Sequence, residues 1–477
     1  MAIAPARLAA FEILLKMEAG TGHSDELLRT LRVQSLSAQD RNLCTNLVMG
    51  TLRWQIALDA QVARLLSRPD TKLDPGVRVA LRLGAFQLLH LDRIPAHAAI
   101  SESVEIAKFG GEGFAAGMVN AVLRKIAVAG PPVVPVRFRN AAELAAVYAH
   151  PAWMVERWVR FYGMARAIEI CRYNQEPPPA TVWLDGEPGG RGPGGAGSAA
   201  GSLPADGAAA PDEFTFEGVE LAPGAFLARS YRVVRGDVAA TGAYRHGQVR
   251  IQDEGSQLVA ELAGEGNRIL DCCAAPGGKT AILAERNPAA SLLACDVSAR
   301  RLEQMKRLFE GRASCQTGQV RGASIDFEVT DAADLRRNGE FDLVLCDVPC
   351  SGTGTLARNP EIRHRFNLQS LPRQHARQVD ILASAMRAVA PGGRLVYATC
   401  SLEPEENELV VDACVGEGSG FRRVAFDTAA LRKRGVLRET GVDSDAVESA
   451  FDQGYLRTLP GVHPCDGFFA ALLVKAS

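Results

Sequence analysis

The chain has 477 residues, roughly three times the ~150 residues of a typical domain, so two or three domains are expected. Hydrophobic residues make up 47% of the sequence and charged residues 23%, the balance of an ordinary globular protein. The net charge of −2 excludes a polycation that coats nucleic acid. Lys and Arg still outnumber Asp and Glu by 17 to 12 over residues 1–140, against 36 to 43 in the rest of the chain. This mildly basic front end permits a nucleic-acid partner.

The sequence carries no signal for export, membrane insertion or metal binding. Its start, MAIAPARLAAFEILLKMEAG, has an acid and a base inside the apolar stretch and lacks a small-residue cleavage site. No run approaches the ~18 apolar residues of a membrane helix. The 11 cysteines have no regular spacing and form no CxxC pair, the nearest approach being Cys346 and Cys350. We therefore expect a cytoplasmic protein with reduced thiols, no membrane partner and no metal.

Residues 1–140 are predicted to be helical throughout. Leucines and other large apolar residues recur at helical spacing from Leu8 to Leu15 and from Leu43 to Leu58. Asp74-Pro75 predicts an N-cap followed by proline at the first helical position. Two further helices fit residues 100–108 and 114–128, and no strand-like alternation interrupts them. This pattern predicts a helical bundle that ends near the Gly130-Pro131-Pro132 turn.

Residues 141–250 are predicted to form a small connecting α/β segment. A helix is expected over Trp153–Arg172, before the proline run at 177–179. Residues 186–211 are almost entirely Gly, Ala, Pro and Ser, a composition that buries too little apolar area to offset chain entropy. We interpret that stretch as a disordered insertion.

Residues 251–477 show strand–helix alternation. The predicted strands are short apolar runs at Arg268–Cys272, Leu292–Cys295, Asp326–Thr330, Leu343–Cys346 and Arg394–Ala398. The predicted helices are Lys279–Arg286, Ala299–Phe309 and Gln374–Val389. Such alternation predicts a parallel sheet with helices on both faces, and ligands bind such sheets beyond the carboxyl ends of the strands.

The first of these strands runs into a turn of small residues. The turn comprises Cys273, Ala274, Ala275, Pro276, Gly277 and Gly278, and is followed by Lys279-Thr280. The ending resembles a phosphate-binding P-loop, but that motif requires glycine at position 273. What remains is a turn that lets a ligand approach the backbone at a helix start, or a tight turn with no ligand.

Acidic residues follow the next two predicted strands. Asp296, 18 residues after Gly278, is placed to bind the hydroxyls of a ribose. Asp331 is placed to accept a hydrogen bond from an adenine amino group. Each acid taken alone is more often a helix N-cap. Together with the glycine turn they favour an adenosine-containing ligand, and the absence of a phosphate cradle favours S-adenosylmethionine.

Two cysteines follow the last two predicted strands. Cys350 comes after Asp347 in DVPCSGTG, and Cys400 lies in TCS. Buried cysteines usually act as small hydrophobes, which is our interpretation of Cys272, Cys295, Cys346 and Cys414. Neighbouring strands would bring Cys350 and Cys400 to one cleft beside Asp347. Two thiols and an acid near a methyl donor suggest covalent chemistry on an unreactive carbon.

In this order and spacing, DCCAAPGGKT, CDVS, TDA, DVPCSGTG and TCS resemble the RNA (cytosine-C5)-methyltransferase family. RNLCTNLVMGTLRW, AHAAISESVEIAKFGG and MVNAVLRKI resemble the NusB-like RNA-binding domain of its bacterial RsmB/Sun branch. Outside that domain, HPAWMVERWVRFYG, IQDEGSQLV and the terminal DGFFAALLVK also resemble the RsmB/Sun branch. The resemblance covers nearly the whole chain except the Gly/Ala insertion. It implies an all-α NusB-like bundle at 1–140, the connecting segment at 141–250 and an α/β Rossmann-like S-adenosylmethionine-dependent methyltransferase domain at 251–477.

The resemblance also implies a role for each site residue. Cys400 would add to C6 of a cytosine, and Cys350 would assist elimination after methylation. Asp347 would supply a proton at the N3 edge, and Lys279 would favour the thiolate. Residues 273–279 would wrap the cofactor, Asp296 would bind its ribose and Asp331 its adenine, and Asp347 would border both pockets. The target base must leave its stack or lie in a single strand.

The chain departs from the family pattern at two places. Trp183-Leu184-Asp185 stands where an Arg-x-Asn is usual, which removes a positive charge from an RNA contact. Val348 replaces a usual alanine, a small change of volume that we do not expect to alter the chemistry.

Several alternatives remain open at the level of sequence. A DNA cytosine methyltransferase would use Pro349-Cys350 alone, whereas the second thiol at Cys400 favours the RNA family. Amino-group methyltransferases use a D/N-P-P-aromatic loop that this chain lacks. A non-enzymatic ribosome-assembly module would have no need for the complete set of site residues. The RsmB/Sun branch implies small-subunit ribosomal RNA as substrate, with transfer RNA as the alternative, and we expect a monomer.

Overall fold

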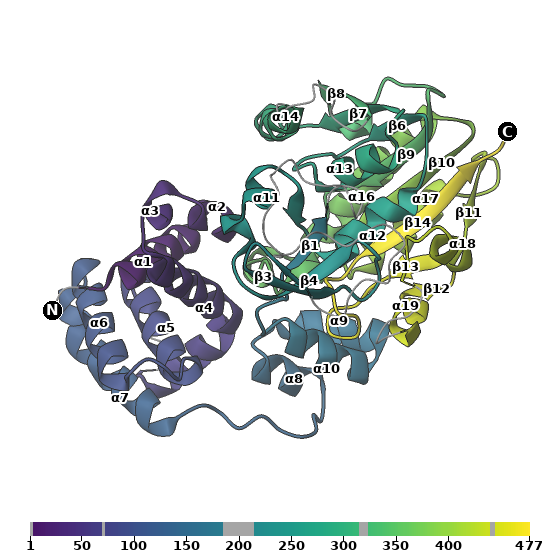
Figure 1. Cartoon of the computed structure of the whole chain (residues 1–477). Helices are drawn as coiled ribbons and strands as arrows, with labels where there is room; N and C mark the ends of the chain where they lie inside the picture. The colour runs from purple at the N-terminus through teal and green to yellow at the C-terminus, as the bar shows by residue number, and fades with distance from the viewer. Residues whose placement is uncertain (1–2, 69–71, 185–213, 314–322, 439–443) are drawn as a thin grey trace. The chain divides into compact units, whose positions relative to one another are not determined.

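The computed structural model describes residues 3–68, 72–184, 214–313, 323–438 and 444–477 (Figure 1). The chain forms two compact units. The first comprises residues 1–177 together with 356–365, and the second comprises residues 178–355 together with 366–477. The predicted insertion at 186–211 lies outside the described residues.

The first unit is helical, as predicted for the N-terminal part of the chain. Its helices are α1 (Pro5–Glu18), α2 (Ser24–Leu28), α3 (Leu31–Gln34), α4 (Ala38–Leu65), α5 (Pro75–His90), α6 (Ala96–Phe109), α7 (Ala116–Ala129), α8 (Ala141–Val147), α9 (Ala152–Tyr162), α10 (Met164–Tyr173) and α15 (Ile362–Arg365). Two glycines let neighbouring helices pack closely: a Cβ on Gly50 of α4 would lie 1.9 Å from the Phe86 ring of α5, and one on Gly84 of α5 would lie 2.5 Å from Leu123 of α7. The first unit therefore has its own tightly packed core.

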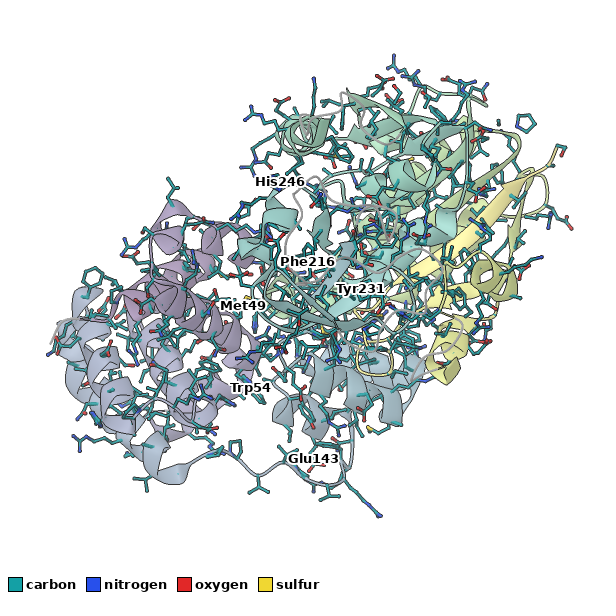
Figure 2. The ribbon with its side chains drawn as sticks, in the orientation of Figure 1. Met49, Trp54, Glu143, Phe216, Tyr231 and His246 are labelled. Carbon is teal, nitrogen blue, oxygen red and sulfur yellow. The ribbon has the colours of Figure 1, made fainter. Side chains whose placement is uncertain are left out.

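Helices α8, α9 and α10 show how local signals set helix ends. The Asn140 side chain accepts a hydrogen bond from the Glu143 backbone N–H at 2.9 Å and caps α8 (Glu143 is labelled in Figure 2). The single helix predicted over Trp153–Arg172 is wrong, because two helices occupy that stretch. Gly163 has φ +83° and ends α9, a conformation that interrupts a continuous helix.

Residues 356–365 belong to the first unit although they follow the DVPCSGTG motif in sequence. The buried guanidinium of Arg363 donates hydrogen bonds to the carbonyls of Arg53 at 2.9 Å and of Ala149 and Asn174 at 3.2 Å. Burial lowers the pKa of Arg363 to about 9. The Glu361 carboxylate accepts hydrogen bonds from the backbone N–H and the hydroxyl of Ser24 at 3.2 and 2.8 Å. These contacts make the segment an integral part of the helical unit.

The second unit begins with a small antiparallel sheet in the order β2-β3-β4-β1-β5. Its strands are β1 (Thr181–Leu184), β2 (Phe214–Phe216), β3 (Val219–Pro223), β4 (Ser230–Arg235) and β5 (Val249–Ile251), and α11 (Gly242–Arg245) precedes β5. Phe216 of β2 and Tyr231 of β4 are labelled in Figure 2. Trp183 of β1 is fully buried, and its indole Nε1 donates to Glu285 at 2.7 Å. Trp183, at the departure from the family pattern, is therefore a core residue.

The main sheet has the order β12-β13-β14-β10-β9-β6-β7-β8, with β11 paired to β14. Its strands are β6 (Arg268–Asp271), β7 (Ser291–Asp296), β8 (Ser324–Val329), β9 (Phe341–Asp347), β10 (Val389–Thr399), β11 (Phe421–Val424), β12 (Phe451–Asp452), β13 (Tyr455–Arg457) and β14 (Phe469–Lys475). Strands β6 to β10 pair in parallel, which confirms the predicted parallel sheet, whereas β14 runs antiparallel to β10. The predicted strands overlap β6 to β10. The antiparallel edge was not predicted.

Helices cover both faces of this sheet. They are α12 (Glu254–Ala263), α13 (Gly278–Arg286), α14 (Ala299–Ala313), α16 (Leu371–Ala388) and α17 (Glu408–Cys414), with α18 (Thr428–Lys433) and α19 (Ser444–Ala450) near the C-terminus. Leu343 and Leu345 of β9 pack in one core with α12, α13 and α14, whereas Val344 and Cys346 pack in another with α16 and α17. This alternation follows from the period of two in a strand.

Within the described ranges, no helix is both long enough and apolar enough to cross a lipid bilayer.

Candidate active site

The carboxyl ends of β6, β7, β9 and β10 carry the residues that the sequence singled out. Strand β6 lies between β7 and β9. Strands β7 and β8 are added on one side of β6, and β9 and β10 on the other, so β6 marks the switch point of the strand order. Open α/β sheets bind ligands at such a switch point.

The turn between β6 and α13 has the tight conformation that its glycines predict. Gly277 has φ +99°, and a Cβ there would lie 2.9 Å from Met305. The helix begins at Gly278 with no side-chain cap, which leaves backbone N–H groups of its first turn available. Thr280 of that turn donates a hydrogen bond to the buried Asp271 carboxylate at 2.7 Å, and burial raises the pKa of Asp271 to about 7. This bond ties the helix to the end of β6.

Asp296 and Asp331 each accept hydrogen bonds from nearby backbone N–H groups, and Asp331 is the N-cap of a short 3-10 turn. The buried Asp296 ends β7, and its carboxylate accepts from the backbone N–H of Ser298 at 2.8 Å and of Ala275 at 3.3 Å. Asp331 follows β8 and accepts from the backbone N–H of Ala333 at 3.1 Å. Asp296 thus joins the small-residue turn to the end of the next strand. A carboxylate has about four acceptor sites, so these hydrogen bonds leave others on Asp296 and Asp331 for a ligand.

An ion pair links the first turn of α13 to the end of β9. Lys279 Nζ lies 2.7 Å from the Asp347 carboxylate. Burial by itself would lower the pKa of Lys279, but the Asp347 charge and hydrogen bond outweigh it, with further contributions from Cys400 and Asp271, so the net shift is upward. Lys279 therefore keeps its positive charge in a largely buried position beside Cys400.

The thiols of Cys350 and Cys400 lie side by side, with their Sγ atoms 3.4 Å apart. Cys350 follows β9 and Cys400 follows β10, and these strands pair in parallel with Ala398 opposite Asp347. The hydrogen bond with Cys400, burial and the charge of Glu406 raise the pKa of Cys350 well above its usual value. The structure thus brings both predicted thiols together at one end of the sheet.

The two cysteine loops are also joined through their backbones. The Gly354 N–H donates to the Cys400 carbonyl at 2.9 Å, and the Gly467 N–H donates to the Gly354 carbonyl at 2.8 Å. A Cβ on Gly354 would lie 2.2 Å from the Gly467 carbonyl, so only glycine allows this approach. The loop before β14 therefore packs directly on both cysteine loops.

Comparison with known proteins assigns this arrangement to a family. Residues 260–474 match the family model of the 16S rRNA methyltransferase RsmB/F, and residues 4–128 match the NusB family. The chain is 33% identical over 474 residues to the probable ribosomal RNA small subunit methyltransferase B of Bacillus subtilis (strain 168), covering 98% of each chain. The chain belongs to the RsmB/F family of rRNA methyltransferases.

Another relative supports this assignment, and two solved structures have the same fold. The ribosomal RNA small subunit methyltransferase B of Pseudomonas putida is 30% identical over 474 residues, again covering 98% of each chain. The crystal structure of PH0851 superposes with a TM-score of 0.72 at 21% identity, covering 100% of both chains. A methyltransferase homolog from Pyrococcus horikoshii superposes with a TM-score of 0.50 at 20% identity, covering 71% of this chain and 100% of that one. These structures share the fold.

As an RsmB/F methyltransferase, the protein uses S-adenosylmethionine, and the residues present fit this cofactor. Carboxylates accept hydrogen bonds from ribose hydroxyls and from an ammonium group, and Asp296 and Asp347 lie close enough to Cys273 of the turn to raise the pKa of its thiol, after the larger effects of burial and Cys346. Gln252, which follows β5, places a buried Oε1 with no hydrogen-bond partner 3.0 Å from the position of a Gly278 Cβ. The turn thus offers carboxylates and an unused carbonyl oxygen to a cationic ligand with several donors.

The described residues contain no cluster of three or more His, Cys, Asp or Glu side chains with the geometry of a metal site. Four polar residues that were not predicted as site residues hold the two cysteine loops together, namely Ser351, Gln378, Ser401 and Glu406. Gln252, at the small-residue turn, was not predicted either. Glu406 lies in the run EPEENE, which reads as a solvated charged stretch. Only its position six residues after Cys400 could have identified it.

Proposed function

We propose that the protein methylates C5 of one cytosine in small-subunit (16S) ribosomal RNA, through a covalent bond between Cys400 and C6 of the base. The observation that supports this proposal most directly is the 3.4 Å separation of the Cys350 and Cys400 thiols beside the Lys279–Asp347 ion pair. A methyltransferase acting on an amino group or a hydroxyl has no use for two adjacent thiols at its reaction centre.

The first step in this proposal makes C5 nucleophilic. The Cys400 thiolate forms an Sγ–C6 bond while the C5=C6 double bond opens and N3 takes up a proton. We assign the delivery of that proton to Asp347, with Lys279, 2.7 Å away, able to replace it on the carboxylate. A positive charge beside a thiol also favours the thiolate. S-adenosylmethionine supplies the electrophilic methyl group that C5 then binds.

The second step releases the RNA. After methylation C5 gives up its proton to a base, Cys350 assists the elimination in which the Sγ–C6 bond to Cys400 breaks, and the C5=C6 double bond returns as N3 gives up its proton. Cys350 is next to Cys400 in space, so both thiols reach the same ring. We assign cofactor binding to residues 273–279, the ribose to Asp296, the adenine to Asp331, and a border with both pockets to Asp347.

We further propose a division of labour along the chain, in which residues 1–140 bind RNA, residues 141–250 connect, and residues 251–477 carry out catalysis. The excess of 17 Lys and Arg over 12 Asp and Glu in residues 1–140 supports docking on phosphates, which predicts binding that weakens with salt. We expect a monomer acting in the cytoplasm on ribosomal RNA.

The experiment that tests the proposed function is a nucleotide-resolved map of 5-methylcytosine. RNA from cells that lack the enzyme is incubated with the purified protein and S-adenosylmethionine, both as naked RNA and as small-subunit particles. One new 5-methylcytosine in 16S RNA is the expected result. Methylation of a different atom, or of transfer RNA instead, would contradict the proposal.

A further inference from the structure

The buried carboxylate of Glu406 binds the residues that follow both cysteines. Glu406 ends the short 3-10 turn Pro404–Glu406, just after the TCS motif, and is fully buried. Its Oε1 accepts a hydrogen bond from the Ser351 backbone N–H at 2.8 Å. Its Oε2 accepts from the Ser401 hydroxyl at 2.5 Å and also from the Ser351 hydroxyl. One carboxylate therefore joins the residue after Cys350 to the residue after Cys400.

Neighbouring groups fix Glu406 in place. The Gln378 amide of α16 donates to Glu406 Oε1 at 3.1 Å and to the carbonyl of Pro349, the residue before Cys350, at 3.0 Å. The Tyr397 hydroxyl of β10 donates to the Glu406 backbone carbonyl at 2.6 Å. Cys350 is thus held from the residue before it and the residue after it, with Glu406 at the centre of the network.

The charge of Glu406 does not explain its presence. No ion pair among the described residues includes Glu406. Its charge contributes to raising the pKa of Cys350, after the larger effects of the Cys400 hydrogen bond and burial, and so opposes thiolate formation there. Burying a carboxylate with no cation beside it costs free energy, and only its hydrogen bonds offset that cost. The useful property of Glu406 is its capacity to accept several hydrogen bonds at once.

We propose that Glu406 is a positioning residue that holds the Cys350 and Cys400 thiols side by side. The proposal rests on the proposed function for the importance of that spacing, but the spacing itself can be measured without RNA or cofactor. Gln at this position keeps the geometry, because its oxygen can replace Oε1 and its amide can donate to both serine hydroxyls. Ala removes this side-chain bridge and leaves only the other links between the loops, such as that from the Gly354 N–H to the Cys400 carbonyl.

The rate of disulfide formation between Cys350 and Cys400 reports how closely the two thiols are held together. Diamide oxidises two thiols to a disulfide and takes up their two hydrogens on its azo group, and the S–S bond of about 2.05 Å requires the sulfurs to approach closely. The rate of the Cys350–Cys400 crosslink is followed by peptide mapping in the wild-type protein, Glu406→Gln and Glu406→Ala. We expect the Gln variant to react within about threefold of wild type, and the Ala variant at least about tenfold more slowly because the thiols are no longer pre-positioned.

Two control variants separate positioning from general destabilisation. Glu261→Ala removes another buried carboxylate of the same unit, paired with Arg286 at 2.8 Å, and should lower Tm without slowing the crosslink. Ser401→Ala removes one of the Glu406 hydrogen bonds and should slow the crosslink by about threefold even if Glu406→Ala fails to fold. A wild-type crosslink rate in folded Glu406→Ala or Ser401→Ala would overturn the proposal, as would a Gln variant as slow as the Ala variant.

An activity measurement then links the spacing to catalysis. In Glu406→Ala we expect kcat to fall at least about tenfold, with the Kd for S-adenosylmethionine within twofold of wild type. Glu406→Gln should restore kcat. If no 5-methylcytosine forms with any variant while the crosslink still depends on Glu406, the proposed function fails and the positioning role stands.

Discussion

Two pairs of neighbouring cysteines in the methyltransferase unit have opposite surroundings. The inner pair is Cys272 and Cys346, fully buried in the apolar core beside α16 and hydrogen-bonded to each other. The outer pair is Cys350 and Cys400, half-buried just beyond β9 and β10, with Sγ atoms 3.4 Å apart. Cys400 of the outer pair lies beside the Lys279 ammonium, and the residues after both outer cysteines bind the buried Glu406 carboxylate.

The comparison shows that proximity of two thiols does not by itself make a reactive site. In both pairs the mutual hydrogen bond and burial raise a thiol pKa, of Cys272 in one and of Cys350 in the other. The difference lies in what else is present: polar loops, a buried cation and a partial opening to solvent. The inner pair has the surroundings of small hydrophobic core residues.

The largest expected effect is the loss of methyl transfer in Cys400→Ala. Without the nucleophile no bond to C6 forms, so C5 stays unreactive and no covalent RNA complex accumulates. Single-turnover transfer of a labelled methyl group measures this directly. Transfer close to the wild-type rate would show that Cys400 is not the nucleophile. The outer pair would then have no catalytic role that the inner pair lacks.

The next effect concerns the acid beside the outer pair. Asp347→Asn breaks the ion pair with Lys279 and removes a route for protonating N3, so we expect kcat to fall about 10²-fold or more. Asp342→Asn is the matched control, because Asp342 lies at the other end of β9 and accepts hydrogen bonds from the backbone of Asn267 and Arg268. Equal losses in both variants would mean that the strand is merely destabilised.

A smaller effect is the pH dependence of thiol alkylation. The raised pKa of Cys350 means that its thiolate fraction at a given pH is lower than in a free cysteine, so its reaction with iodoacetamide should rise about tenfold per pH unit from pH 7 to 9. Cys272 should stay unmodified in the folded protein over the same range because it is inaccessible. In Cys400→Ala, loss of the first cause of the shift should increase Cys350 alkylation at pH 8. Peptide mapping checks each site.

The smallest effect is expected at the inner pair. Cys346→Ala removes a buried sulfur from a packed core and should lower the free energy of unfolding by about 1–2 kcal/mol, with kcat within about twofold of wild type. Chemical denaturation and steady-state kinetics measure the two quantities. A large loss of kcat at unchanged stability would assign the inner pair a catalytic role.

Much of the sheet was predictable because its strands are continuous apolar runs, and their carboxyl ends located Asp296, Asp347, Cys350 and Cys400. Gly163 was missed as a helix end, because helical periodicity continues on both of its sides. Strand β14 and its antiparallel neighbours were missed: β14 lies between β10 and β13, and the direction in which a buried strand runs leaves no mark on its apolar pattern.

The polar network around the outer pair was not predictable from the sequence. Gln378 lies on α16, and Glu406 lies within a run of acids, so nothing local marks either side chain as buried. Ser401 is only five residues from Glu406, but the other partners of Glu406, Gln378 and Ser351, are 28 and 55 residues away along the chain. Hydrogen bonds between distant segments have no signature in periodicity or spacing.

The most direct measurement of the central claim is the covalent state of Cys350→Ala on its RNA. The protein is incubated with S-adenosylmethionine and undermethylated small-subunit RNA or particles, and the complex is denatured, digested and analysed by mass spectrometry. We predict a stable link between Cys400 and a methylated cytosine, because the thiol that assists elimination is missing. Full turnover without any adduct, or an adduct on a different cysteine, would contradict the roles assigned to the outer pair.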